Sequence, residues 1–80
     1  MVDSRGPEYQ RLYATLRQLR EERDLTQTEL GDRLGYTQRK VSLFESGDRR
    51  IDVIELCRFA RGLNVPLTEI LDRAGIDYPA

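Results

Sequence analysis

Apolar residues recur along this chain at spacings of three and four, which is the period of an amphipathic helix. Over residues 8–23 the series is Tyr9, Leu12, Tyr13, Leu16 and Leu19. Two similar series follow near the end, with Val53, Leu56, Phe59, Ala60 and Leu63 in one and Leu67, Ile70 and Leu71 in the other. No segment alternates with period two for long enough to predict a strand. The pattern therefore predicts an all-α chain.

Capping signals divide the middle of the chain into two short helices. Thr26 and Glu29 have the spacing of a capping box, in which each side chain accepts from the other residue's amide. Gly35 stops the helix that follows, because glycine adopts a positive φ at little cost. Thr37 is the next N-cap, and it predicts a helix over 38–45.

A second capping box starts the fourth helix. Asp52 and Glu55 have the same three-residue spacing as the first box. Asn64 suits the left-handed position after that helix, and Pro66 suits the start of a fifth. The fifth helix is expected to end near Gly75. The sequence thus predicts five short helices, packed as one compact domain over residues 8–75 between tails 1–7 and 76–80.

Composition agrees with a single small domain. Of the 80 residues, 39% are hydrophobic and 34% are charged, which is typical of a compact soluble protein. No run approaches the roughly 20 apolar residues of a membrane helix, and the first residues lack the apolar stretch of a signal peptide. We expect a cytoplasmic protein with no membrane partner.

Few residues suited to catalysis or metal binding are present. The chain has no histidine and one cysteine, which excludes a zinc site of the usual kind. Cys57 is expected to be a small buried hydrophobe rather than a redox sensor. No glycine-rich phosphate loop occurs, and Glu21-Glu22 lacks a pocket-forming context. The sequence therefore predicts no enzyme, no cofactor and no metal.

Two helices joined by Gly35-Tyr36-Thr37 are the most informative feature, because a short glycine turn sets two helices at a steep angle. Gly31 lies within the first of them at a cost of about 1 kcal/mol relative to Ala, which indicates close packing there. Residues 25–71 resemble the lambda-repressor-like helix-turn-helix family, also called the xenobiotic-response-element type. The resemblance is carried by Leu25-Thr26-Gln27, Glu29-Leu30, Leu34-Gly35, Thr37-Gln38, Val41-Ser42, Phe44-Glu45-Ser46-Gly47 and Leu63-Asn64-Val65.

The resemblance implies a DNA-binding site centred on the third helix, which enters the major groove in this family. The positions that read bases in the family are Gln38, Arg39, Ser42 and Leu43. The positions that contact phosphate are Gln27, Thr37, Lys40, Arg49 and Arg50. The chemistry agrees, because Arg can form a fork with guanine and Gln with adenine. Leu43 contacts a thymine methyl or packs on a neighbouring side chain.

The resemblance also implies a structural ion pair. Arg20 and Glu45 match two residues that form a buried salt bridge in phage relatives. Pairing would neutralise Glu45, whose carboxylate would otherwise oppose DNA binding.

The expected function is that of a sequence-specific transcriptional regulator, such as a repressor, that binds double-stranded DNA as a homodimer on a two-fold symmetric operator. Candidate dimer contacts are apolar residues near the C-terminal end of the chain that a small core can leave exposed: Ile54, Ile70, Ile76 and Tyr78. The alternative for these residues is that they pack in the core or in the tail. The alternative is an antitoxin or co-regulator whose main role is to bind a protein. Residues 51–80 carry five acids and three bases, which suits a basic partner.

Overall fold

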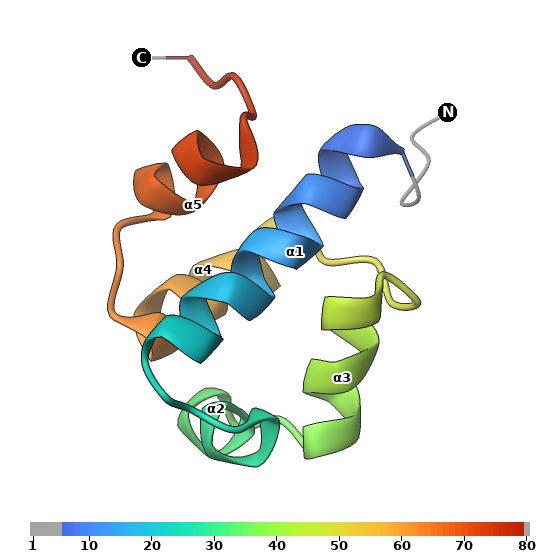
Figure 1. The fold of residues 1–80 in the computed structure, drawn as a ribbon, viewed down its shortest axis with the longest axis vertical. Helices are drawn as coiled ribbons and strands as arrows, with labels where there is room; N and C mark the ends of the chain where they lie inside the picture. Colours follow the sequence, from blue (N-terminus) through green and yellow to red (C-terminus); the bar gives the residue numbers. More distant parts are fainter. Residues whose placement is uncertain (1–5, 80) are drawn as a thin grey trace.

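The computed structural model describes residues 6–79. Five helices follow one another, and the described residues contain no strand (Figure 1). In chain order they are α1 (Pro7–Glu22), α2 (Gln27–Leu34), α3 (Gln38–Ser46), α4 (Val53–Leu63) and α5 (Leu67–Ala74). The all-α, five-helix prediction is confirmed. Most of the expected N-terminal tail, and Ala80 of the C-terminal tail, lie outside the described residues.

The predicted caps form at the helix starts. Thr26 Oγ1 accepts from the Glu29 amide at 3.0 Å, and the Glu29 carboxylate accepts from the Thr26 amide at 2.9 Å. Asp52 and Glu55 make the same reciprocal bonds at 2.7 and 3.0 Å. Pro66 differs slightly from expectation, because it is the N-cap of α5 rather than its first helical residue.

The turn between α2 and α3 requires two glycines for different reasons. Gly35 has φ +74°, the left-handed conformation that favours glycine. Gly31 lies directly under the turn, where a Cβ atom would be 2.5 Å from the Tyr36 carbonyl oxygen. The Tyr36 amide also donates to the Gly31 carbonyl at 2.9 Å. The close packing predicted at Gly31 is thus against the backbone of the turn.

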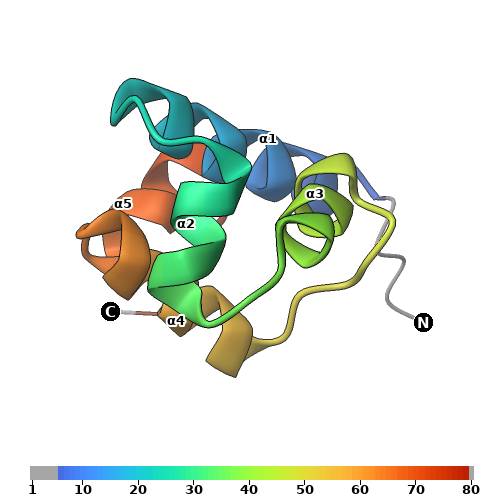
Figure 2. The ribbon, with the colours of Figure 1, turned by 90° about the horizontal axis from the view of Figure 1, so that it is seen from below.

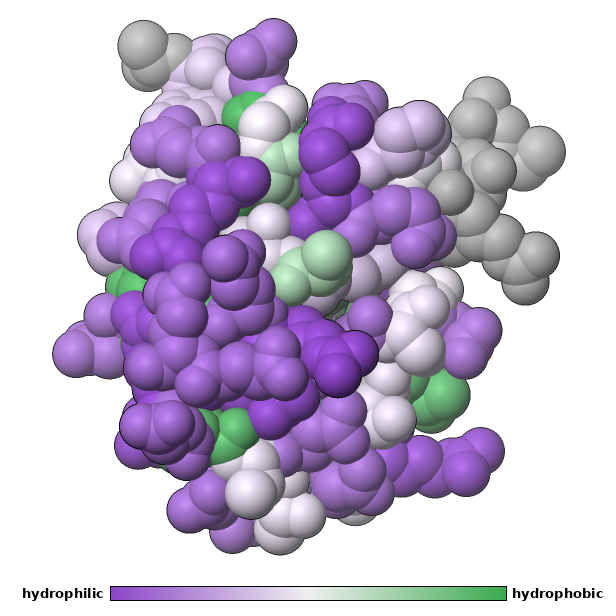
Figure 3. All heavy atoms as spheres, in the orientation of Figure 1, coloured by the Kyte–Doolittle hydropathy of each residue, from purple (hydrophilic) through white to green (hydrophobic). Residues whose placement is uncertain are grey.

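Helix α1 crosses the molecule and packs against α3, α4 and α5, while α2 packs against α3 and α4 (Figures 1 and 2). The interior contains Phe44 from α3 and Phe59 from α4, whose rings meet edge to face at 5.5 Å. Tyr13 of α1, a member of the apolar series of that helix, is also fully buried. In the view of Figure 3 the surface is mostly hydrophilic. Every helix within residues 6–79 is too short or too polar to cross a lipid bilayer.

Two predictions about burial are wrong. Ile70 was a candidate surface residue, but its side chain is completely buried because it lies on the side of α5 that faces the core. Cys57 was expected to be buried, but it is half-exposed. It lies beside the fully packed face of α4 rather than on it, since Leu56 and Phe59 occupy that face.

Candidate nucleic-acid interface

Helix α3 has one face in the core and one face open to solvent. Val41 and Phe44 are fully buried, and they hold the helix against the rest of the domain. Gln38 and Arg39 in its first turn are exposed, and Ser42 is half-exposed. Leu43 is also half-buried. The residues predicted to read bases are therefore open to solvent in full or in part, and Gln38 and Arg39 begin α3 directly after the turn from α2, which Figure 2 shows.

A buried ion pair holds the C-terminal half of α3 against α1. Arg20 Nε donates to Glu45 Oε2 at 2.7 Å, and Arg20 Nη2 donates to Glu45 Oε1 at 3.0 Å. The two side chains are only 11% and 3% exposed. A third guanidinium nitrogen donates to the Leu25 carbonyl at 2.7 Å. The hydrogen bond to Glu45 raises the pKa of Arg20 above its ordinary value, so the guanidinium stays charged.

Two glutamines extend this pair to the surface. Gln27 Nε2 donates to Glu45 Oε1 at 3.1 Å, and Gln38 Nε2 donates to Gln27 Oε1 at 2.6 Å. The Glu45 carboxylate can only accept, so Gln27 must turn its amide nitrogen inward and its oxygen outward. Gln38 must in turn offer its own nitrogen to Gln27. Its oxygen and one N–H then remain for a ligand.

This connection was not predicted from the sequence. Gln27 was expected at a phosphate-contact position and Gln38 at a base-reading position, with no bond between them. The two residues begin α2 and α3, and the steep turn brings those two helix starts together. The only available signal was that a glutamine follows each of two threonine N-caps.

Glu55 binds two of the cations that were predicted to contact phosphate. Lys40 Nζ lies 3.8 Å from Glu55 Oε2, and Arg49 Nη2 lies 3.6 Å from the same oxygen. Lys40 Nζ also stands 4.0 Å from the centre of the Tyr36 ring, and Arg49 lies over Phe44 at 5.4 Å. Both cations therefore have partners within the protein.

The remaining predicted contacts are free to meet a ligand. Arg39 and Arg50 are exposed, and neither has a carboxylate within 4.0 Å in the described part of the chain. Thr37 Oγ1 accepts from the Lys40 amide at 3.1 Å, which leaves its hydroxyl hydrogen able to donate. Thr37 and Arg39 offer a hydrogen-bond donor and positive charge at the exposed start of α3, and Arg50 offers positive charge in the loop beyond its end.

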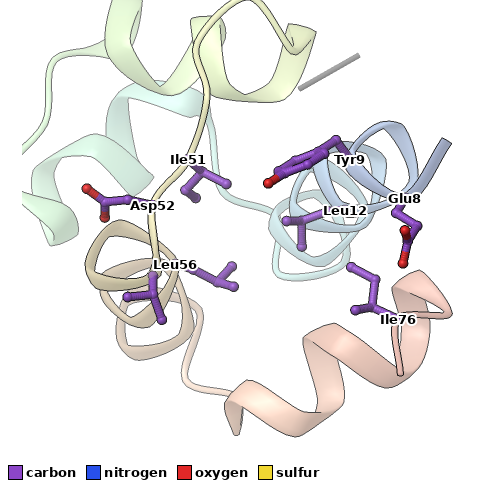
Figure 4. A pocket seen from close by; sticks show the side chains of 8 residues that line it. Glu8, Tyr9, Leu12, Ile51, Asp52, Leu56 and Ile76 are labelled. Atoms are coloured by element: carbon purple, nitrogen blue, oxygen red, sulfur yellow. The ribbon is translucent and has the colours of Figure 1, made fainter. Parts of the chain in front are cut away.

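A separate apolar area surrounds the N-terminus of α4. Ile54 is 62% exposed, and its neighbour Val53 is 65% exposed, although the sequence pattern placed Val53 in the apolar series of α4. An adjoining cleft of about 390 Å³ is lined by α1, the start of α4 and Ile76 (Figure 4). Ile76 is only half-buried against the core, and Tyr78 is exposed while its hydroxyl donates to Asp72 at 2.8 Å. Three of the four predicted dimer contacts thus keep some exposed surface.

The order of the helices, the glycine turn and the exposed start of α3 define a helix-turn-helix domain. The sequence profile of a family described as helix-turn-helix domain matches residues 11–72, and the chain belongs to that family. Among solved structures, the chain is similar to the clp gene regulator ClgR from C. glutamicum, with a TM-score of 0.79 and 23% identity. The match covers 82% of this chain and 86% of that one, and it establishes a shared fold. A search of curated proteins finds no match.

Proposed function

We propose that this protein is a sequence-specific DNA-binding transcriptional regulator that inserts the start of α3 into the major groove. One observation carries the proposal: Gln38 and Arg39 are exposed at the start of α3, and the buried Arg20–Glu45 pair fixes Gln38 through Gln27. A connection of this kind contributes only about 1 kcal/mol to the stability of the fold. A base reader gains a fixed orientation, which lowers the cost of ordering its side chain on binding.

The free atoms of Gln38 match adenine. Its oxygen can accept from adenine N6, and its remaining N–H can donate to N7. Arg39 stands beside it with a guanidinium suited to guanine O6 and N7. Ser42 and Leu43, one turn further along, are proposed to contact the next bases, with Leu43 against a thymine methyl.

Phosphate contacts are proposed on both sides of the residues that are proposed to read bases. The Thr37 hydroxyl and the second N–H of Gln27 can donate to one strand, and Arg50 can contact the backbone beyond α3. Lys40 and Arg49 complete the proposed set, and each must leave Glu55 to reach a phosphate.

We further propose a homodimer on a two-fold symmetric site. The molecule measures 31 × 25 × 20 Å, so two copies in contact can place their α3 helices about 34 Å apart, one turn of DNA. The exposed Val53 and Ile54, together with Tyr78 and the neighbouring cleft, are the proposed contact area. A repressor that acts in the cytoplasm by occupying a promoter is the simplest regulator of this kind.

The second candidate is an antitoxin or co-regulator that binds a basic protein through the same area. The acidic surplus of residues 51–80 and the exposed pair Val53 and Ile54 favour it. In this case DNA binding would require, or be modified by, the partner.

Selection of bound duplexes from a random pool tests the proposal. We expect a short sequence repeated with two-fold symmetry and half-site centres about 10 base pairs apart. Recovery of a single half-site would contradict the dimer. Recovery of no common sequence by the purified protein alone would contradict the proposed function and favour the second candidate.

A further inference from the structure

Glu55 occupies an unusual place beside the proposed DNA-binding surface, because three elements meet at its carboxylate. Its own backbone and side chain complete the cap of α4 with Asp52. Lys40 approaches from α3, and Arg49 approaches from the loop between α3 and α4. A capping box needs one carboxylate oxygen, Oε1, and this leaves Oε2 for the two cations.

The two ion pairs are loose. Their N···O distances of 3.8 and 3.6 Å exceed those of a good charged hydrogen bond, which are about 2.7–2.9 Å. The Lys40 and Arg49 side chains are 31% and 47% exposed, so solvent and other anions can reach them. Ion pairs at such distances, whose cations are open to solvent, contribute little to stability. A DNA phosphate would therefore compete with Glu55 for the same two cations.

We propose that Glu55 is a specificity-determining residue that limits how many cations the protein offers to DNA phosphates. The inference rests on the proposed function. Binding to any DNA sequence depends on the number of cations that displace counterions, whereas base contacts act only at the correct site. A carboxylate that occupies Lys40 and Arg49 weakens binding to every sequence alike and leaves the Gln38 and Arg39 contacts in place. Discrimination between DNA sequences then depends more on the contacts of Gln38 and Arg39 with the bases.

Glu55→Gln separates this role from the cap. Glutamine also completes a capping box, so α4 should still begin at Val53, but the negative charge is gone. The probe is a random-sequence duplex, and the readout is the slope of log affinity against log salt concentration. We expect a steeper slope, by up to about 0.9 for each released cation, or about 1.8 per subunit. When salt is raised from about 50 to 200 mM, the steeper slope adds roughly a tenfold loss of affinity per subunit for Glu55→Gln relative to the unmodified protein.

Glu29→Gln is the matched control. Glu29 completes the capping box of α2, so the variant changes the net charge equally and keeps its cap, but no cation lies within 4.0 Å of it in the described residues. Its slope should equal that of the unmodified protein. Equal slopes for Glu55→Gln and Glu29→Gln would overturn the inference.

A double variant tests the same point without touching Glu55. Lys40→Ala combined with Arg49→Ala should lower the slope of the otherwise unmodified protein by clearly less than about 1.8 per subunit, because Glu55 competes with phosphate for both cations. A loss of the full amount would overturn the inference while leaving DNA binding itself established. Failure of the unmodified protein to bind any duplex would instead overturn the proposed function, and this inference with it.

Discussion

Glu45 and Glu55 both bind basic side chains around α3, but they do so in different ways. Glu45 is 3% exposed and accepts two bonds from Arg20 and one from Gln27, at 2.7 to 3.1 Å. Glu55 is 15% exposed and faces Lys40 and Arg49 at 3.6 to 3.8 Å. A tight buried carboxylate can fix the position of a neighbouring group, whereas a loose and more exposed one can release its partners. Glu45 should therefore govern the stability of the fold and the orientation of Gln38, and Glu55 should govern the affinity for DNA.

Removing the buried carboxylate should have the largest effect. Glu45→Ala leaves Arg20 buried and unpaired, which should cost about 3–5 kcal/mol of unfolding free energy. Glu55→Gln keeps its cap and loses only exposed pairs, so it should cost less than about 1 kcal/mol. Urea unfolding measures both. A cost below about 1 kcal/mol for Glu45→Ala would mean that Glu45 contributes no more to stability than Glu55 does.

Gln27→Ala tests whether the buried pair orients the surface. The variant removes the connection between Glu45 and Gln38 but leaves both residues in place. Discrimination at the base pair that Gln38 is proposed to read should fall by about 1–2 kcal/mol, with a stability loss of about 1 kcal/mol. Competition binding across the four bases measures the first effect. Gln18→Ala, at an exposed position on α1, is the matched control; the same loss there would refute the orienting role.

Arg50→Ala tests an exposed cation that has no carboxylate partner within the described residues. Lys40 and Arg49, in contrast, both face Glu55. Binding to all sequences should weaken equally, and the salt slope should fall by about 0.9 per subunit. Arg61→Ala, on the exposed side of α4, should leave the slope unchanged. A changed base preference in Arg50→Ala would place that side chain at a base instead of a phosphate.

The smallest effect is expected at an ion pair that is both short and exposed. Arg73 Nη1 donates to Glu22 at 2.7 Å, and this bond lowers the pKa of Glu22. A carboxyl whose pKa is lower in the folded state stabilises the fold at neutral pH and loses that contribution as the pH falls through the lowered pKa. The stability difference between the unmodified protein and Glu22→Gln should therefore shrink as the pH falls below the ordinary carboxyl pKa of about 4.5, and it should vanish once Glu22 is protonated in the folded state. A difference that grows on acidification would contradict this assignment.

Local signals predicted the helices well. The two capping boxes, the Thr37 N-cap and the glycine turn are short-range features whose partners lie three or four residues apart in the sequence. The apolar series of α5 shows where the pattern was insufficient. Leu67, Ile70 and Leu71 are all apolar, and the packing of α5 against α1 and α4 decides that Ile70 is the fully buried one.

The hydrogen bonds and ion pairs between side chains of different helices could not be predicted from short-range spacing. Gln27 and Gln38 are 11 residues apart, and Gln27 and Glu45 are 18 apart. Their bonds depend on how α1, α2 and α3 pack together. Glu55 was identified as a cap from its spacing to Asp52, but its approach to Lys40 depends on how α3 packs beside α4. The Arg20–Glu45 pair was expected only through the family resemblance, and the structure forms it.

Arg39→Ala is the most direct test of base reading by the start of α3. Arg39 is exposed, so the variant should keep the fold. Its affinity for the selected site should fall by about 1–3 kcal/mol per half-site, and preference should relax at one base pair. The measurement is a binding comparison of all four bases at every half-site position. Uniform weakening, with every base preference intact, would show that Arg39 contacts only phosphate and would contradict the account.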